Sequence, residues 1–175
     1  YRQALLTVDL ADGDEILREK LAEMQVDSFD AGLSWEDDVV GEIDGGEMID
    51  RLGGYWTLSD HMTYPVILAK IPVKDPWQIF AYLPIGGWNE CPNAEEMMAI
   101  AKKWYEKYGA VAATVSHDVV EFVLDKPLDN QNEALALALE QFAFCPDRVD
   151  QSAEGTAGAL ADTLLKSVVW YFWWD

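Results

Sequence analysis

The sequence predicts an α+β fold, a single domain in which a mixed, mostly antiparallel sheet packs with about three helices. Two observations predict this fold. β-rich runs flank a short polar turn near residue 117, as in a hairpin, and capped helical segments lie among the strand-like runs without strict alternation. The 175 residues suit one domain with a modest extension. Half of the residues are hydrophobic, including eight tryptophans, so the chain has ample apolar area for a core.

Residues 1–60 are expected to form an acidic, variable N-terminal extension, and residues 61–175 the α+β domain. The extension holds sixteen acidic and four basic residues. The spacing predicts a helix over 14–24, whose apolar stripe is Ile16, Leu17, Leu21 and Met24. Residues 30–56 are rich in glycine and acids and are expected to form loops and brief strands.

Strand signals begin at residue 64. The run YPVILAKIPV, residues 64–73, predicts a strand, and residues 76–87 predict a second strand or a short helical turn that leads into one. The β-rich runs at 110–115 and 119–124 flank Ser116–His117–Asp118 and predict a hairpin. The bulky run at 167–175 predicts a closing strand.

Three helices are expected in the second section. Asn93 with Glu96 forms a capping box that opens a helix through 108, and Gly109 suits the position just past its end. Asn130 with Glu133 opens a second helix, with Leu135, Leu139 and Phe142 on one stripe, which Cys145–Pro146–Asp147 ends. Residues 157–166 predict the third.

The net charge of −20 limits the classes of molecule that the protein is expected to bind. A protein that binds nucleic acid needs a basic surface against the phosphates, so nucleic acid is not expected. A basic protein, a cation or a saline host would each suit this surface. No run is long and apolar enough for a membrane helix and the start lacks a signal core, so we expect a cytoplasmic protein without a membrane partner. Two cysteines, Cys91 and Cys145, make no disulfide framework, and reduced thiols are expected.

The turn PIGGWNECP, residues 84–92, is the first candidate site. Its two glycines permit a sharp turn that carries Trp88, Asn89, Glu90 and Cys91 together. The N-terminus of the following helix would lower the pKa of a nearby thiol, so Cys91 is a candidate reactive thiol or metal ligand. Alternatively Trp88 fills the core while Asn89 and Glu90 satisfy loop amides.

The hairpin carries the second candidate set, His117, Asp118 and Glu121. Glu121 lies inside an apolar run and is expected to be partly buried, where a carboxylate needs a partner or a raised pKa. If residues 117–123 form a regular strand, His117 and Glu121 share a face about 13 Å apart and could line one cleft. His117 and Asp118 are also a candidate acid/base pair, although adjacent residues of a regular strand point to opposite sides. A turn histidine and an ion-paired glutamate are the structural alternative.

The third candidate set follows the second helix and includes Asp147, Asp150 and Gln151. Cys91, His117, Cys145 and Asp147 would make a chemically sensible zinc set, although their wide spacing matches no compact zinc motif. Buried structural thiols are the alternative, and no cofactor is predicted. Trp173, Trp174 and Asp175 end the chain as a closing run that suits either the core or a binding surface.

Several of these motifs together resemble a bacterial family called domain of unknown function 4253. They are IPVKDPWQIFAYLPIGGWNECP, WYEKYGA, HDVVEF, EQFAFCPD followed by DQ, LADTLL and the terminal WYFWWD, over about residues 64–175. The resemblance implies a shared fold and no established activity. It also marks as family positions Pro76, Trp77, Gly86, Gly87, Trp88, Asn89, Cys91, Pro92, Glu121, Cys145, Asp147, Gln151, Trp173, Trp174 and Asp175.

Three functions remain open. The favoured one is an acidic, non-enzymatic interaction module, an immunity or antitoxin-like protein that binds a basic protein partner. The second is a metal-binding or hydrolytic enzyme that uses Cys91, His117, Glu121 and Cys145. The third is a small-ligand pocket lined by Trp88, Trp173 and Trp174, in which Asn89 and Glu90 give polar specificity.

Overall fold

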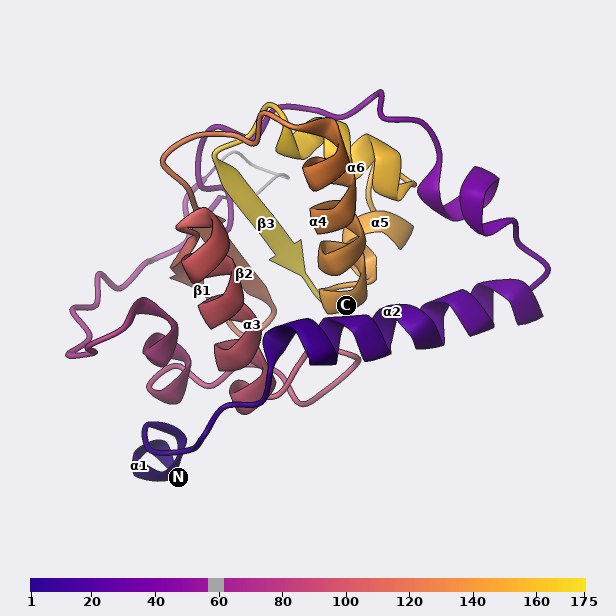
Figure 1. Cartoon of the computed structure of the whole chain (residues 1–175). Coiled ribbons are helices and arrows are strands. Elements are labelled where there is room, and N and C mark those ends of the chain that lie inside the picture. Colours follow the sequence, from indigo (N-terminus) through magenta and orange to yellow (C-terminus); the bar gives the residue numbers. More distant parts are fainter. Residues whose placement is uncertain (57–61) are drawn as a thin grey trace.

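The computed structural model describes residues 1–56 and 62–175 (Figure 1). Helices and a three-stranded antiparallel sheet make up one α+β domain, which confirms the predicted fold class. No helix in these two ranges has the length and apolarity that crossing a membrane requires. In chain order the elements are α1 (Arg2–Leu5), α2 (Gly13–Asp30), the π-helical turn η1 (Trp35–Val40), the 3₁₀ helix η2 (Pro76–Ala81), α3 (Ala94–Tyr108), β1 (Val111–Val115), β2 (Val119–Val123), α4 (Gln131–Phe144), α5 (Asp147–Asp150), α6 (Ala157–Leu164) and β3 (Val169–Trp173).

The sheet has the order β1-β2-β3. The predicted hairpin is confirmed: β1 and β2 pair antiparallel, with an irregular register between Ala112 and Thr114. The predicted closing strand is also confirmed, because β3 pairs antiparallel with β2 and places Tyr171 opposite Glu121. Alternation along the strands divides the sheet into two faces.

One face of the sheet packs on α3 and α4 through an aromatic cluster. The indole of Trp104 in α3 meets Phe122 edge-on, with ring centroids 5.6 Å apart, and stacks on Phe172. Phe144 in α4 contacts Phe172 and Trp174 edge-on. Aromatic pairs at these distances add to the free energy of burial, so the cluster forms the centre of the core. Most of the large aromatic residues of the closing strand therefore serve the core.

Helix boundaries follow the capping residues. Asn93 Oδ1 accepts from the amides of Glu95 and Glu96, and the Glu96 carboxylate accepts from the Asn93 amide, so the predicted capping box is present. Gly109 ends α3 in the left-handed region, as predicted. Asn130 accepts from the Glu133 amide at the start of α4, and this cap is also confirmed.

The N-terminal section shares its core with the rest of the chain. The helix predicted over 14–24 is present and runs farther, from Gly13 to Asp30, and it packs against α3 and α4. Leu17 in α2 is buried in the same cluster as Trp104. Lys103 Nζ in α3 lies 2.7 Å from Asp14 Oδ1 and 2.6 Å from Glu140 Oε1, which ties α2 to α4. The predicted division between residues 60 and 61 falls within 57–61, outside the described residues.

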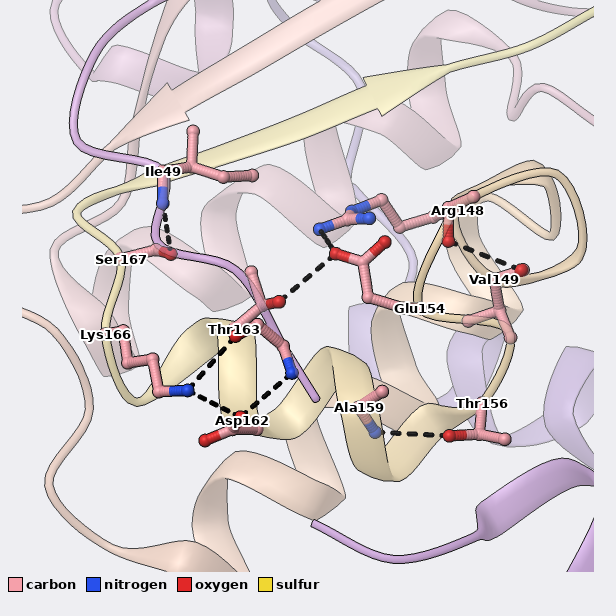
Figure 2. A network of polar contacts seen from close by, with 12 residues as sticks. Ile49, Arg148, Val149, Glu154, Thr156, Ala159, Asp162, Thr163, Lys166 and Ser167 are labelled. Carbon is pink, nitrogen blue, oxygen red and sulfur yellow. Dashed lines mark hydrogen bonds and ion pairs between the residues drawn. The ribbon is translucent and has the colours of Figure 1, made fainter. Parts of the chain in front are cut away.

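Residues 41–56, here called the strap, connect η1 to the second face of the sheet. Figure 2 shows how polar contacts fasten the strap to α6 and to the loop that follows α6. The Gly46 amide donates to Asp162, the Ile49 amide donates to Ser167 Oγ, and Lys166 Nζ donates to the Gly46 carbonyl. In place of the brief strands expected over 30–56, the structure has η1, loops and an isolated bridge from Trp56 to Thr63.

The strand predicted over 64–73 is wrong. The segment has no regular secondary structure, and its side chains are largely exposed, including Ile67 at 92%. Its β-branched residues suit a strand, but a strand is stable only where its backbone groups pair with a neighbour. The second expectation, a helical turn within 76–87, is confirmed by η2, whose Asp75 and Gln78 form a capping box.

Candidate functional site

The turn before α3 holds a strained backbone that presents two polar side chains. Cys91 N donates to the Trp88 carbonyl at 2.9 Å, and the two residues between them, Asn89 and Glu90, have φ of 44° and 63°. This is the pattern of a primed β-turn, which places both central side chains outward. Gly86 is required beside it, because a Cβ there would collide with the Pro92 carbonyl oxygen.

The short helix α5 supplies the opposite side of the site. It begins after Pro146, directly beyond the end of α4, and Gln151 follows its last turn. Arg148 anchors it: Nη2 lies 3.0 Å from Glu154 Oε1, which also accepts from Thr163 in α6 (Figure 2). Burial by itself would raise the pKa of Glu154, but the hydrogen bond and charge of Arg148 lower it below the ordinary value.

The turn and α5 together line an open polar cavity of about 270 Å³, most of whose lining residues are exposed. Its lining residues are Asn89, Glu90, Pro146, Asp147, Asp150 and Gln151. Five of them, Asn89, Glu90, Asp147, Asp150 and Gln151, are candidates from the sequence, and the fold brings them together from two segments that lie more than fifty residues apart. The cavity combines three carboxylates with two side-chain amides.

Hydrogen bonds and repulsion set the charge pattern of the cavity. Asp147 accepts from Gln151 Nε2 at 2.7 Å and from the Asp175 amide at 2.9 Å, so its position is held from two sides. Burial raises the pKa of Asp150, and the charges of Asp147 and Glu90 raise it further. The cavity is therefore a place where added negative charge is unfavourable and a cation is favourable.

The cysteines do not fit the reactive-thiol prediction. Cys91 is 4% exposed and burial raises its pKa to about 12, the opposite of the lowering expected from the helix N-terminus. Burial likewise raises the pKa of Cys145 to about 12, and its Sγ donates to the Trp173 carbonyl at 3.1 Å. Desolvation of a thiolate exceeds the effect of the helix terminus here. Both thiols are protonated at neutral pH.

The hairpin residues do not join the cavity. His117 lies in the turn, with its side chain 87% exposed, and its Nδ1 is 3.1 Å from Asp118 Oδ1. The opposite orientation of neighbours in a strand does not apply to this pair, because β2 begins at Val119 and the two residues precede it. Glu121 is fully buried, which exceeds the partial burial expected from the sequence. Its Oε1 accepts from the Gly53 amide of the strap at 2.6 Å, while Oε2 has no partner among the described residues.

The tryptophans occupy different environments. Trp88 is 39% exposed on the turn beside the cavity, whereas Trp174 is buried against Phe144 and Phe172. Trp173 is half-buried on the second face of the sheet. Asp175 reaches the cavity region through its backbone amide.

The structure also tests the zinc set. Cys91 and Cys145 are buried, while His117 is exposed in the hairpin turn. Across residues 1–56 and 62–175, no three or more His, Cys, Asp or Glu side chains are arranged to hold a metal ion. His61 lies outside the described residues.

Pro146 completes the cavity and was predicted only as part of the helix end. In a helical turn, residues three and four positions apart share a face, so Asp150 and Gln151 lie beside Asp147. The sequence placed these residues after a helix end without showing that a separate short helix, α5, follows Cys145 and Pro146.

Comparison with known proteins gives one finding. No curated protein and no solved structure matches the chain. The model of the family described as domain of unknown function (DUF4253) matches residues 67–175, which is more than half of the sequence and includes every residue that lines the cavity. The resemblance seen in the sequence motifs is thereby confirmed, and this protein belongs to the DUF4253 family.

Proposed function

We propose that this protein is a non-enzymatic interaction module whose cavity accepts a cationic side chain of a basic protein partner. The observation that carries the proposal is the convergence of Glu90, Asp147 and Asp150 on one cavity of about 270 Å³. None of the residues that line the cavity is basic; burial raises the pKa of Asp150, and repulsion from Asp147 and Glu90 raises it further. A guanidinium or ammonium group would relieve this repulsion.

The surroundings of the cavity support a cationic ligand. Arg148, which belongs to α5, is directed to Glu154 and so does not neutralise the cavity. The amides of Asn89 and Gln151 add neutral polar groups to the same lining, which can orient a planar guanidinium. Trp88 offers an exposed aromatic surface on the adjacent turn. The net charge of −20 would speed the approach of a basic partner.

Such a module acts by covering a basic surface of its partner. An immunity or antitoxin-like role is of this kind, because masking requires affinity and no chemical step. The acidic charge over the whole chain raises the association rate, and the cavity supplies the site-specific contact.

The test is a titration with two short blocked peptides, one centred on arginine and one on lysine, followed by NMR. We expect shifts of the side-chain amides of Asn89 and Gln151, and affinity reduced by about tenfold, or ~1.4 kcal/mol, in Glu90→Gln/Asp150→Asn. Glu106→Gln/Asp125→Asn removes the same charge from exposed positions outside the cavity and is the matched control. Equal loss of affinity in both double variants would show that net charge alone attracts the peptides and would refute a specific site.

A further inference from the structure

The C-terminal half of α2 exposes an apolar stripe. Ala22, Val26 and Phe29 follow one another along α2 at spacings of four and three residues, which is the spacing of a coiled-coil seam, and Leu33 comes just beyond the end of the helix at Asp30. All four are exposed, Val26 at 59% and Phe29 at 80%. The core side of α2, which carries Leu17, lies on the other side of the helix. The stripe is therefore a second apolar face that the domain itself does not cover.

Acidic residues flank this stripe. Glu15, Glu19, Glu23 and Asp27 stand at successive four-residue steps and are all exposed, here called the acidic ladder. Within the described part of the chain, no ion pair involves any of them. Like charges four residues apart cost a helix about 0.2–0.5 kcal/mol per pair. Repulsion among these carboxylates therefore lowers the stability of α2 in the free protein.

The end of α2 adds a further unfavourable feature. Asp27 and Asp30 lie in the last turn, where no basic residue is present. The C-terminus of a helix carries partial negative charge, so cations are favoured there and carboxylates are not. A basic group near this end would reduce the repulsion within the acidic ladder and would also interact favourably with the partial negative charge of the helix C-terminus.

The stripe and the ladder meet in a hollow of the surface. Ala22, Glu23, Val26 and Asp27 line a depression of about 330 Å³. In Figure 1 this half of α2 runs beyond α3 and α4, and the four residues that line the depression are exposed. An exposed apolar helix face with carboxylates along one side fits a helix that is apolar on one face and basic beside it.

We propose that the C-terminal half of α2 binds a basic amphipathic helix of a partner protein. One occupant relieves all three unfavourable features: it covers the stripe, pairs with the ladder and places cations at the helix C-terminus. A second copy of this chain would set ladder against ladder, and like charges across a helix pair disfavour that arrangement. The proposal does not depend on the cavity, which lies between the turn before α3 and α5.

The probe is a synthetic peptide of about 18 residues with leucines at seam positions and lysines elsewhere, long enough to span this half of α2. Two control peptides have the same composition in scrambled order, or glutamates in place of lysines. Binding is measured by anisotropy of the labelled peptides against the full chain. We expect the first peptide to bind with a dissociation constant in about the micromolar range, and both controls to bind at least about tenfold more weakly.

Variants locate the site of binding. Val26→Ser/Phe29→Ser should weaken binding by at least about tenfold, and Glu19→Gln/Glu23→Gln should weaken it and reduce its salt dependence. Glu106→Gln/Asp125→Asn is the matched charge control and should bind as the native protein does. All substituted residues are exposed, so the variants should keep the native circular dichroism.

Three outcomes would overturn the proposal. The first is equal binding of the ordered and scrambled basic peptides, and the second is binding that Val26→Ser/Phe29→Ser leaves unchanged. The third is a dimer of the free protein, seen by sedimentation equilibrium, that Phe29→Ser abolishes, which would make a second copy the occupant.

Discussion

Leu17→Ala tests whether the N-terminal section is an integral part of the domain. Leu17 is 2% exposed and belongs to the same core cluster as Trp104, although the two residues lie far apart in the sequence. Truncating a buried leucine removes its transfer free energy and leaves a cavity, together about 3 kcal/mol. For a chain of this size, that loss lowers the melting temperature by about 6–12 °C.

The assay compares two optical signals during urea or thermal unfolding. Tryptophan fluorescence reports mainly on residues 62–175, which hold six of the eight tryptophans, including Trp104, Trp170 and Trp174 of the aromatic cluster, while far-ultraviolet circular dichroism reports on all helices. We expect Leu17→Ala to move both transitions together to lower denaturant. Val26→Ala, on the exposed side of the same helix, is the matched control and should change stability by less than about 0.5 kcal/mol.

One result would refute this reasoning. If the fluorescence midpoint stays at its native value while helical signal is lost at lower denaturant, α2 unfolds independently of the aromatic cluster. Residues 1–56 would then be a separable extension, as the sequence predicts, and the shared core would contribute little to the stability of the rest.

Three further predictions concern the candidate site. Asp150→Asn should raise stability near neutral pH: burial raises the folded-state pKa, so ionisation costs more in the folded than in the unfolded chain, and native stability falls as pH rises through that range. This gain in stability should vanish below about pH 3.5, where the carboxyl of Asp150 is also protonated in the unfolded chain. Unfolding midpoints measured at several pH values test this, and a gain that does not change with pH would contradict the reasoning. Gly86→Ala should destabilise the domain by at least about 2 kcal/mol, because φ is positive and the new Cβ would collide with the Pro92 carbonyl; an unchanged melting temperature would contradict this. Cys91 and Cys145 should react with a thiol reagent only after unfolding, since both are buried and burial raises each pKa to about 12, and rapid reaction of the native protein would show that the site opens.

Local signals in the sequence predicted most elements correctly. The ends of α3 follow from Asn93, Glu96 and Gly109, whose side chains or backbone freedom satisfy groups at the helix ends. The hairpin follows from two β-rich runs and the short polar segment between them. In each case residues close in sequence supply the determining interactions, so no knowledge of distant segments is needed.

Features that depend on distant partners were predicted poorly. The run 64–73 has strand composition, but the sheet of the described residues ends at β1 and β3 and does not include it. The pKa of Cys91 moved opposite to the prediction, because neighbours from elsewhere in the chain bury the thiol. Apolar residues lie on two faces of α2. Only the packing of α2 against α3 and α4 shows which of these faces is buried and which is exposed.

The sequence by itself determined the fold class, the family, the helix caps and most of the residues that line the cavity. Tertiary structure alone decided that Asn89 and Glu90 face Asp147, Asp150 and Gln151, and that Arg148 turns away toward Glu154. The physical reason is the distance along the sequence between the residues that interact. Caps and turns are satisfied within a few residues, whereas burial, repulsion between carboxylates and the exposure of a helix face depend on which distant segments the core brings together.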